Sequence, residues 1–180
     1  MNPRKRSLTA ALITICAVGG TTLVVTGEAS AASYRCTTSK HSIDDPSYSG
    51  PWADNWDVTT KLCAKRSGSY VYAYAKVKWD GPVYARCDDE GIFDKAHFKL
   101  QIKHSKTGND PVKTSKKYYG IESRMENSDA ICNYNNSYKT GTIKWKARSA
   151  KAVADGYLAL NWNNDGRGYR HTGFSASPRV

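Results

Sequence analysis

The segment Ser69–Trp79 alternates strictly between apolar and polar side chains, and this period of two most constrains how the chain can fold. An α-helix would spread such residues around its circumference, whereas a β-strand gathers them on two opposite faces. The segment is therefore predicted to be a strand with one face on a core. The apolar face would consist of Val71, Ala73, Ala75, Val77 and Trp79, and the outward face of Tyr70, Tyr72, Tyr74, Lys76 and Lys78.

A second strand is predicted at Ala96–Lys103, where Ala96, Phe98, Leu100 and Ile102 alternate with His97, Lys99, Gln101 and Lys103. Turn sequences such as Asp80-Gly81-Pro82 and Asp155-Gly156 separate further short strands. These are predicted at 83–87, 112–121, 130–134, 142–148, 157–162 and 169–176. Only Ser149–Ala154 has weak helical character. The predicted fold class is all-β: an antiparallel β-sandwich, or a small barrel, of about seven or eight strands.

The N-terminus has the pattern of a secretory signal peptide. Arg4, Lys5 and Arg6 precede an uncharged, largely apolar stretch, and small residues follow at 29–33. Residues 1–32 are therefore predicted to be a signal peptide that is cleaved off. The mature protein would be secreted and extracellular, with no membrane association after removal. Cleavage takes away these three basic residues and Glu28, which leaves 24 basic and 15 acidic residues.

The mature chain keeps four of the five cysteines, namely Cys36, Cys63, Cys87 and Cys132. An even number of cysteines in an exported chain predicts two disulfides. Sequential pairing, Cys36–Cys63 and Cys87–Cys132, closes the shortest loops and is the pairing that we expect. No two of these cysteines have the close spacing of zinc ligands. Neither a metal nor another cofactor is expected.

The mature chain divides by charge and pattern into two parts. Residues 33–66 are predicted to form an extended, acidic arm, because they are rich in turn residues and show no sustained period. Residues 67–180 would form a basic β-sandwich domain. The arm carries Tyr48, Trp52 and Trp56, which we expect to contact a partner, since tryptophan and tyrosine dominate interface hot spots. The arm could also pack against its own domain.

Lysines gather around one predicted hairpin of the basic domain. Lys99, Lys103 and Lys106 form the centre of a basic patch that could bind an anionic polymer, such as nucleic acid or wall teichoic acid, or serve solubility alone. His97, on the same strand, is interpreted as a solvent-exposed residue. The tyrosine ladder Tyr70-Tyr72-Tyr74 is suited to sugar stacking or protein contact, unless it faces the core.

Most catalytic patterns are missing from the sequence, which has neither a nucleophile elbow nor a phosphate-binding glycine loop. One enzyme class stays open, a small secreted ribonuclease. His171 would be its general acid, Glu122 or Glu126 its base, and Arg167 and Arg170 its phosphate ligands. We expect no catalytic residues, and this ribonuclease is the alternative.

The layout resembles the small secreted adaptor subunits of actinobacterial umbrella toxin particles. It comprises a leader, an aromatic arm bearing Cys36 and Cys63, and a compact two-disulfide β body, which together cover most of the mature chain. The resemblance implies a non-enzymatic subunit that joins a lectin-like subunit to the spokes of a large toxin protein. It also implies that the N-terminal segment inserts into the spoke, with Tyr48, Trp52 and Trp56 as the inserted residues.

The expected function is therefore that of a secreted binding or adaptor protein in an extracellular antibacterial toxin assembly, with larger secreted proteins as partners. Besides the ribonuclease, the alternatives are an anionic-polymer binding module and a protease inhibitor that presents a rigid turn. Asp80-Gly81-Pro82 and the turn at 106–111 are candidates for such an inhibitory turn.

Overall fold

A computed structural model describes residues 32–46, 48–51, 53–82, 91–127, 136–163 and 165–180. The chain divides into Met1–Ser30 and one compact unit, Ala31–Val180, which contains every described residue. Within the described residues, no helix is long and apolar enough to cross a membrane. The predicted signal peptide, 1–32, lies outside the described residues except for Ala32, so its cleavage stays a prediction.

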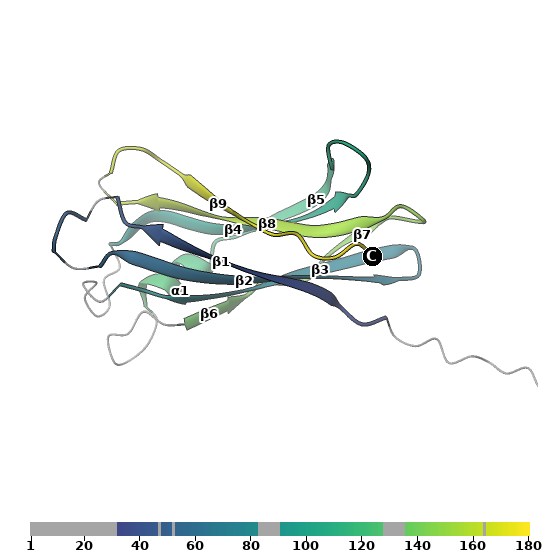
Figure 1. Ribbon diagram of the computed structural model, residues 1–180, viewed down its shortest axis with the longest axis horizontal. Helices are drawn as coiled ribbons and strands as arrows, with labels where there is room; N and C mark the ends of the chain where they lie inside the picture. Colours follow the sequence, from purple (N-terminus) through teal and green to yellow (C-terminus); the bar gives the residue numbers. More distant parts are fainter. Residues whose placement is uncertain (1–31, 47, 52, 83–90, 128–135, 164) are drawn as a thin grey trace, which may run out of the picture. The chain divides into compact units, whose positions relative to one another are not determined.

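Two antiparallel sheets form the two layers of this unit (Figure 1). The first has the order β1-β2-β3-β6, with β7 also paired to β3, and consists of β1 (Arg35–Asp44), β2 (Asn55–Ser67), β3 (Tyr70–Asp80), β6 (Asn136–Lys139) and β7 (Ile143–Lys146). The second has the order β5-β4-β8-β9 and consists of β4 (Phe93–His104), β5 (Val112–Tyr118), β8 (Ala152–Trp162) and β9 (Arg170–Phe174). One short helix, α1, spans Ile121–Glu126. The predicted all-β antiparallel class is confirmed, and no pairing among the described residues closes the sheets into a barrel.

The core lies between the two sheets and confirms both predicted alternations. The apolar residues of β3 and β4 that were predicted to point inward are all buried, and β8 adds Leu158, Leu160 and Trp162. Burying each large apolar side chain contributes about 1.5–3 kcal/mol. Because both sheets supply this core, each sheet would expose its apolar inward face to water if the other were absent.

Residues 33–66, predicted to be an extended arm, instead form two strands of the first sheet. β1 pairs with β2 from Arg35↔Ala64 to Asp44↔Asn55, and β2 pairs with β3 along its length. Trp56 is fully buried in the core, with its ring centroid 5.5 Å from that of Phe93. The predicted boundary at residue 66 falls inside β2. The arm is therefore corrected to a pair of integral strands, because the apolar residues of β2 complete the core.

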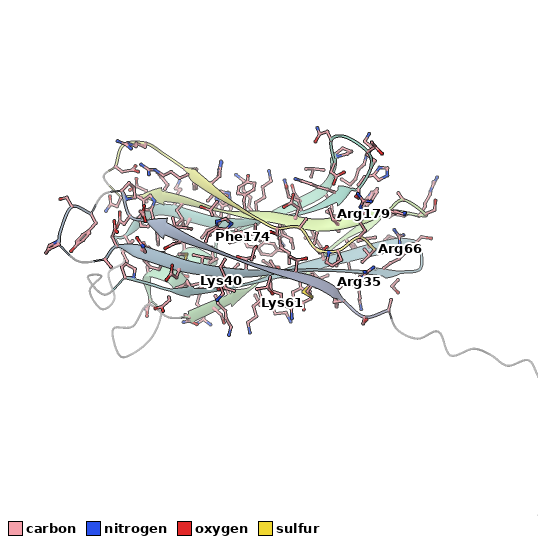
Figure 2. All side chains as sticks on the ribbon, in the orientation of Figure 1. Arg35, Lys40, Lys61, Arg66, Phe174 and Arg179 are labelled. Atoms are coloured by element: carbon pink, nitrogen blue, oxygen red, sulfur yellow. A yellow bond between two sulfur atoms is a disulfide. The ribbon has the colours of Figure 1, made fainter. Side chains whose placement is uncertain are left out.

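The C-terminal segment that follows β9 holds β1 in place. The Arg35 guanidinium donates to the carbonyl oxygen of Arg179 at 2.9 Å, and Arg66 donates to that of Val180 at 3.1 Å. Figure 2 shows Arg35, Arg66 and Arg179 near one another at one end of the unit. This segment covers an inward side of β1 that is largely polar, which explains why the sequence of β1 shows no apolar period. Thr37 and Ser39 lie on that side, opposite Leu62 and Thr60 of β2, and the Ser39 hydroxyl oxygen accepts a hydrogen bond from the N–H of Ser175 at 3.1 Å.

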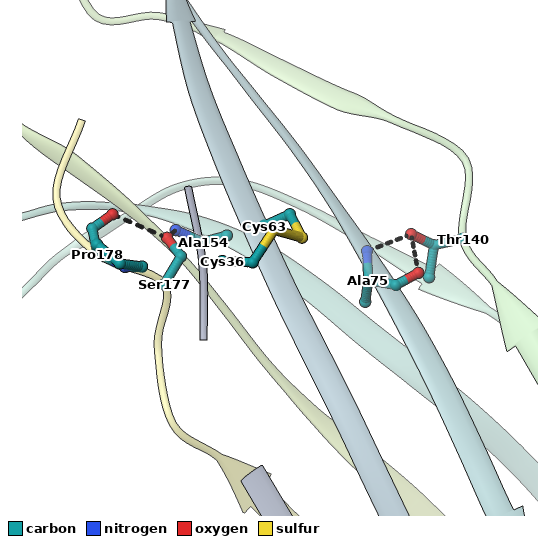
Figure 3. The surroundings of a disulfide bond; sticks show 7 residues. All are labelled: Cys36, Cys63, Ala75, Thr140, Ala154, Ser177 and Pro178. Carbon is teal, nitrogen blue, oxygen red and sulfur yellow. Dashed lines mark hydrogen bonds between the residues drawn. A yellow bond between two sulfur atoms is a disulfide. The ribbon is translucent and has the colours of Figure 1, made fainter. Parts of the chain in front are cut away.

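A disulfide links Cys36 to Cys63, which lie directly opposite each other on β1 and β2 (Figure 3). This confirms the first predicted pair. The two cysteines are 27 residues apart in the sequence, and closing a loop of that length stabilises the fold by about 3.5 kcal/mol in the chain-entropy treatment. Cys87 and Cys132 lie outside the described residues, so the second disulfide stays a prediction.

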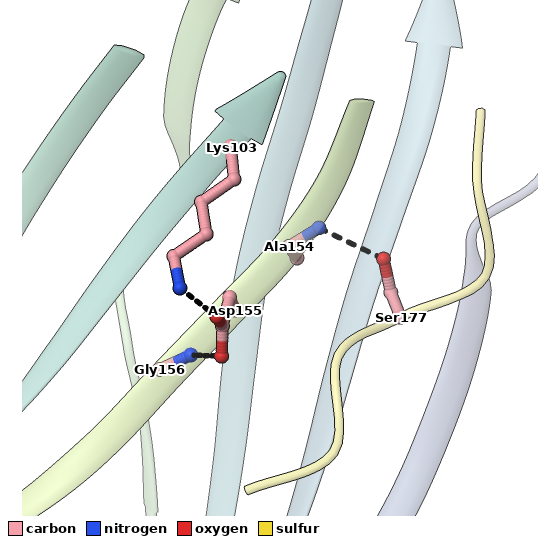
Figure 4. A network of polar contacts seen from close by, with 5 residues as sticks. All are labelled: Lys103, Ala154, Asp155, Gly156 and Ser177. Atoms are coloured by element: carbon pink, nitrogen blue, oxygen red, sulfur yellow. Dashed lines mark hydrogen bonds and ion pairs between the residues drawn. The ribbon is translucent and has the colours of Figure 1, made fainter. Parts of the chain in front are cut away.

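Asp155-Gly156, predicted to be a turn, lies in the middle of β8. A Cβ atom at Gly156 would lie 2.8 Å from the ring of Phe98 and 2.9 Å from a backbone carbonyl oxygen of β4. Glycine is therefore needed here for close strand packing, not for a turn. Asp155 accepts a hydrogen bond from the Gly156 N–H at 2.6 Å and forms an ion pair with Lys103 (Figure 4). The strand begins at Ala152, so the helical character predicted at 149–154 is wrong.

The segment predicted as a strand at 112–121 remains a strand only to Tyr118, because α1 then takes its place beside β4. Glu122 accepts a hydrogen bond from the N–H of Ala96 at 2.5 Å, and Glu126 accepts one from that of Phe93 at 3.0 Å. Side chains four residues apart share a helix face. The two glutamates therefore satisfy the part of β4 that β5 leaves unpaired. The predicted strands 83–87 and 130–134 lie outside the described residues, and β6 was not predicted.

Replacing Gly156 by alanine is expected to destabilise the protein by about 1–3 kcal/mol, because the added methyl group overpacks the β4–β8 contact. Gly173 is the matched control: it lies on the adjacent β9, and a Cβ atom there would have no other atom within 4 Å. Gly173→Ala should leave the free energy of unfolding within about 0.5 kcal/mol of wild type, or raise it slightly. Urea denaturation of both variants measures the difference, and equal stability would contradict the packing role of Gly156.

Candidate functional site

The outer face of the first sheet carries an array of lysine and tyrosine side chains, here called the Lys–Tyr face. Residues directly opposite each other in a sheet share a face. Lys61 is opposite Lys76, which is opposite Lys139, and Lys65 is opposite Tyr72 on the same side. In Figure 2, Lys40 and Lys61 mark this sheet. The Lys–Tyr face consists of Tyr34, Lys40, Lys61, Lys65, Tyr70, Tyr72, Tyr74, Lys76, Lys78, Lys139, Lys144 and Lys146.

The predicted outward orientation of the tyrosine ladder is confirmed, and the ladder organises the lysines around it. The contacts, measured from Nζ to ring centroid, are Lys65–Tyr34 at 4.8 Å, Lys65–Tyr72 at 5.9 Å, Lys139–Tyr74 at 5.0 Å and Lys144–Tyr70 at 5.8 Å. A cation–π contact at an exposed site contributes about 0.5–1 kcal/mol. These contacts restrict the lysines and occupy the ring faces with ammonium groups.

Two adjoining hollows lie at the same sheet. The larger has a volume of about 510 Å³ and is lined by residues that include Lys40, Asp57 and Lys78. The smaller, of about 210 Å³, is lined by Thr38, Thr59, Lys61, Lys76 and Lys78. Carboxylates occur at one end of this surface, where Asp57 lies opposite Asp80. From Thr59 to Lys65 on β2, every charged outward side chain is a lysine, so the potential there is positive.

The residues predicted to contact a partner, Tyr48, Trp52 and Trp56, do not form one exposed surface among the described residues. Trp56 lies in the core and is 0% exposed, so the assignment of Trp56 as a partner contact is corrected. Tyr48 is half-buried in the connection between β1 and β2, and Trp52 lies outside the described residues. The alternation of Trp56 with Val58 and Leu62 is the sequence signal that identifies Trp56 as the first inward residue of β2.

The predicted basic patch of Lys99, Lys103 and Lys106 does not form a uniform surface. Lys103 is paired with Asp155, and Lys99 Nζ lies 5.7 Å from the ring centroid of Tyr157. Lys106 lies beyond the end of β4 and is exposed. The lysines of β2 and β3 were not predicted to form a basic patch. Their alternation with buried residues is the sequence signal that places them together on one face.

The outer face of the second sheet contains a group of aromatic residues around a buried histidine, here called the His97 cluster: His97, Tyr119, Tyr157, Tyr169 and His171. The ring centroid of His97 lies 5.2 Å from that of Tyr119 and 5.0 Å from that of Tyr169. His171 lies 4.7 Å from Tyr157. His97 is only 1% exposed, so its interpretation as a solvent-exposed residue is wrong. The tyrosine rings cover it.

His97 is held in an unfavourable environment. Neither Nδ1 nor Nε2 has a hydrogen-bond partner within the described residues, and a buried polar group left in this state costs about 1–3 kcal/mol. Burial, together with the electrostatic effects of Lys117, His171 and Lys99, lowers the pKa of His97 to about 4. On the rim, burial raises the pKa of Tyr169, as do Tyr119 and Glu122. Buried groups with perturbed pKa values are typical of functional sites.

Three of the residues expected for a ribonuclease have other contacts in the structure. Glu122 and Glu126 accept backbone hydrogen bonds from β4, and Arg170 lies 3.6 Å from the carboxylate of Asp165. The nearby imidazole is that of His97, on the far side of Ala159. Across the described part of the chain, no group of three or more histidine, cysteine, aspartate or glutamate residues could hold a metal ion.

The free energy of unfolding is expected to fall by about 1–3 kcal/mol as the pH drops from the ordinary histidine pKa of 6.5 to the His97 pKa of about 4. In that range the unfolded chain binds a proton at His97 and the folded chain does not, so protons favour unfolding. Urea denaturation across this pH range measures the effect. His97→Phe should show a shallower pH dependence than the wild type. Equal slopes for the wild type and His97→Phe would contradict the assignment.

Comparison with protein families, with characterised proteins and with solved structures finds no match to this chain. The chemistry of the Lys–Tyr face and of the His97 cluster is therefore what supports a functional proposal.

Proposed function

We propose that this chain is an exported, non-enzymatic binding protein whose Lys–Tyr face holds a phosphate-bearing polymer. The observation that carries the proposal is the row Lys61–Lys76–Lys139, in which like charges lie directly opposite one another on three adjacent strands. Like charges in this arrangement destabilise a sheet. A bound polyanion would remove that repulsion, and release of its counterions would favour the complex.

The geometry of the face suits a chain with regularly spaced charges. Neighbouring strands are about 4.8 Å apart, and alternate residues along a strand are about 6.8 Å apart. Lys76 and Lys78 follow one another along β3, while Lys61 and Lys139 lie on the strands at either side. Ammonium groups therefore recur along two directions. A flexible polymer could contact several of them at once.

The tyrosine contacts favour a polymer that the protein binds through its phosphates over one that it binds by stacking on its bases. Lys65, Lys139 and Lys144 lie over the rings of this face, so those ring faces are already occupied. Single-stranded nucleic acid binds best where aromatic faces are open to its bases. A poly(polyol phosphate), the chemistry of wall teichoic acid, needs only the ammonium groups and is the class that we propose.

The adaptor role in a toxin assembly stays a prediction, and it would need a different docking surface. The inserted residues were expected on an arm, but Trp56 is a core residue and β1 and β2 belong to the sheet. Tyr48, in the β1–β2 connection, is the described residue on which such docking would have to rely.

Neutralising three lysines of the face, Lys61→Gln, Lys76→Gln and Lys139→Gln in one variant, is expected to weaken binding of poly(glycerol phosphate) about 10- to 100-fold. The dependence of log affinity on log salt should become shallower by about 2 to 3, since each lost phosphate contact contributes roughly 0.7 to 0.9. Titration of a fluorescently labelled polymer at several NaCl concentrations measures both quantities.

The matched control removes the same charge elsewhere, in the variant Lys106→Gln, Lys113→Gln and Lys151→Gln, all at exposed positions outside the Lys–Tyr face. If this control loses as much affinity as the first variant, net charge alone causes binding and the face assignment is wrong. A thymidine oligonucleotide that binds more tightly than the polyol phosphate, and is weakened more by Tyr72→Ala than by the lysine changes, would contradict the polymer class.

A further inference from the structure

The His97 cluster lies on the opposite side of the core from the Lys–Tyr face, so it requires a separate explanation. His97 belongs to β4 and His171 to β9 of the second sheet, whereas the Lys–Tyr face belongs to the first. The polymer proposed above makes no use of a buried imidazole. Its two buried ring nitrogens have no hydrogen-bond partner within the described residues, whereas most buried polar atoms in proteins have one.

The register of the second sheet places Ala159 between the two histidines. His97 is opposite Ala159, and Ala159 is opposite His171, so all three residues share the outer face. The two imidazoles therefore arise from backbone positions about two strand spacings, or roughly 9.6 Å, apart. Ala159 lies between them on the sheet and is itself fully buried, and the ring centroid of Tyr157 lies 6.4 Å from that of His97 and 4.7 Å from that of His171. A small ligand that displaced the covering tyrosine rings could contact both imidazoles.

Positive charge surrounds Ala159 and the two histidines. Lys99 is opposite Lys117 on β5, and both lysines, together with His171, act on His97. The carboxylate on the neighbouring helix, that of Glu122, accepts the N–H of Ala96. An anion with several acceptor oxygens, such as phosphate, would favour the protonated imidazoles, accept hydrogen bonds from their N–H groups and neutralise the lysines.

The rim of the cluster adds an aromatic component. Tyr119 is 53% exposed and Tyr169 is 38% exposed, and both rings contact His97. Both residues lie outside strands, next to Gly120 and Gly168 respectively, and Gly168 has a positive φ of 69°. Rotation of exposed side chains is fast, so a ligand could displace either ring from its contact with His97. The displaced ring could then stack on a flat ligand.

We propose that the His97 cluster, together with Lys99 and Lys117, binds the phosphate group of a nucleotide, with Tyr119 or Tyr169 stacked on its base. Phosphate fits the imidazoles and lysines, and the base fits the exposed tyrosine rings. The nucleotide could be free or the end of a chain. Uridine 5′-monophosphate and a short uridine oligonucleotide with a terminal phosphate distinguish these two sources.

The test follows the histidine ring signals of the mature protein by NMR during titration with uridine 5′-monophosphate. We expect saturable shifts of His97 and His171, and a rise of the His97 pKa from about 4 towards its ordinary value. His97→Phe and Lys117→Gln should each weaken binding about tenfold or more. Lys113→Gln, the same charge change on the same strand, should stay within about twofold of wild type. Because Lys117 is exposed, its variant tests the site even if His97→Phe does not fold.

Three outcomes would overturn the proposal. The first is the absence of a saturable shift at His97 with either uridine ligand. The second is inorganic phosphate or ribose 5-phosphate binding as tightly as the nucleotide, since the base would then contribute nothing. The third is loss of nucleotide binding in the variant Lys61→Gln, Lys76→Gln, Lys139→Gln, because the nucleotide would then occupy the Lys–Tyr face. Failure of polymer binding in the same variant leaves this test unaffected.

Discussion

The central strands of the two sheets give one of their faces to a shared core, and this division determines where polar side chains can lie. Val77 on β3 and Leu100 on β4 belong to the same buried cluster, so inward positions are filled and closed to ligands. Side chains that could bind a ligand are therefore expected on the two outer faces or in the connections. The molecule consequently offers two chemically different surfaces, one at each side of a single core.

The sequence predicts the fold well where apolar residues occupy every second position, as in β3 and β4. It predicts less where a strand packs against another segment and not against the apolar core. The inward residues of β1 are polar because the C-terminal segment packs against this strand, through contacts such as Arg35 to Arg179. Gly156 shows the same difficulty. Its sequence is that of a turn, yet its role is to let Phe98 approach the backbone of β8, and such a contact depends on another strand.

The two surfaces were predictable to different degrees. The orientation of Tyr72 and Lys76 follows from the alternation of β3, and the sheet register then adds Lys61 from β2. For His97, the alternation correctly gives the outer face but cannot say what covers it. The rings that bury it come from Tyr119 and Tyr169, which are distant in the sequence. A local rule fails here, and in proteins such failures concentrate at functional positions.

Charge arrangement connects the two surfaces. A sandwich that needed only solubility would place opposite charges across neighbouring strands, since such pairs stabilise a sheet and like pairs destabilise it. Here Lys61 and Lys76 are direct partners in the first sheet, and Lys99 and Lys117 are direct partners in the second. Where the sheet provides a carboxylate, as Asp155 does for Lys103, the charge is already balanced. In the described part of the chain, each face has a row of lysines without such a partner, and an anion from outside would stabilise the sheet most at these rows.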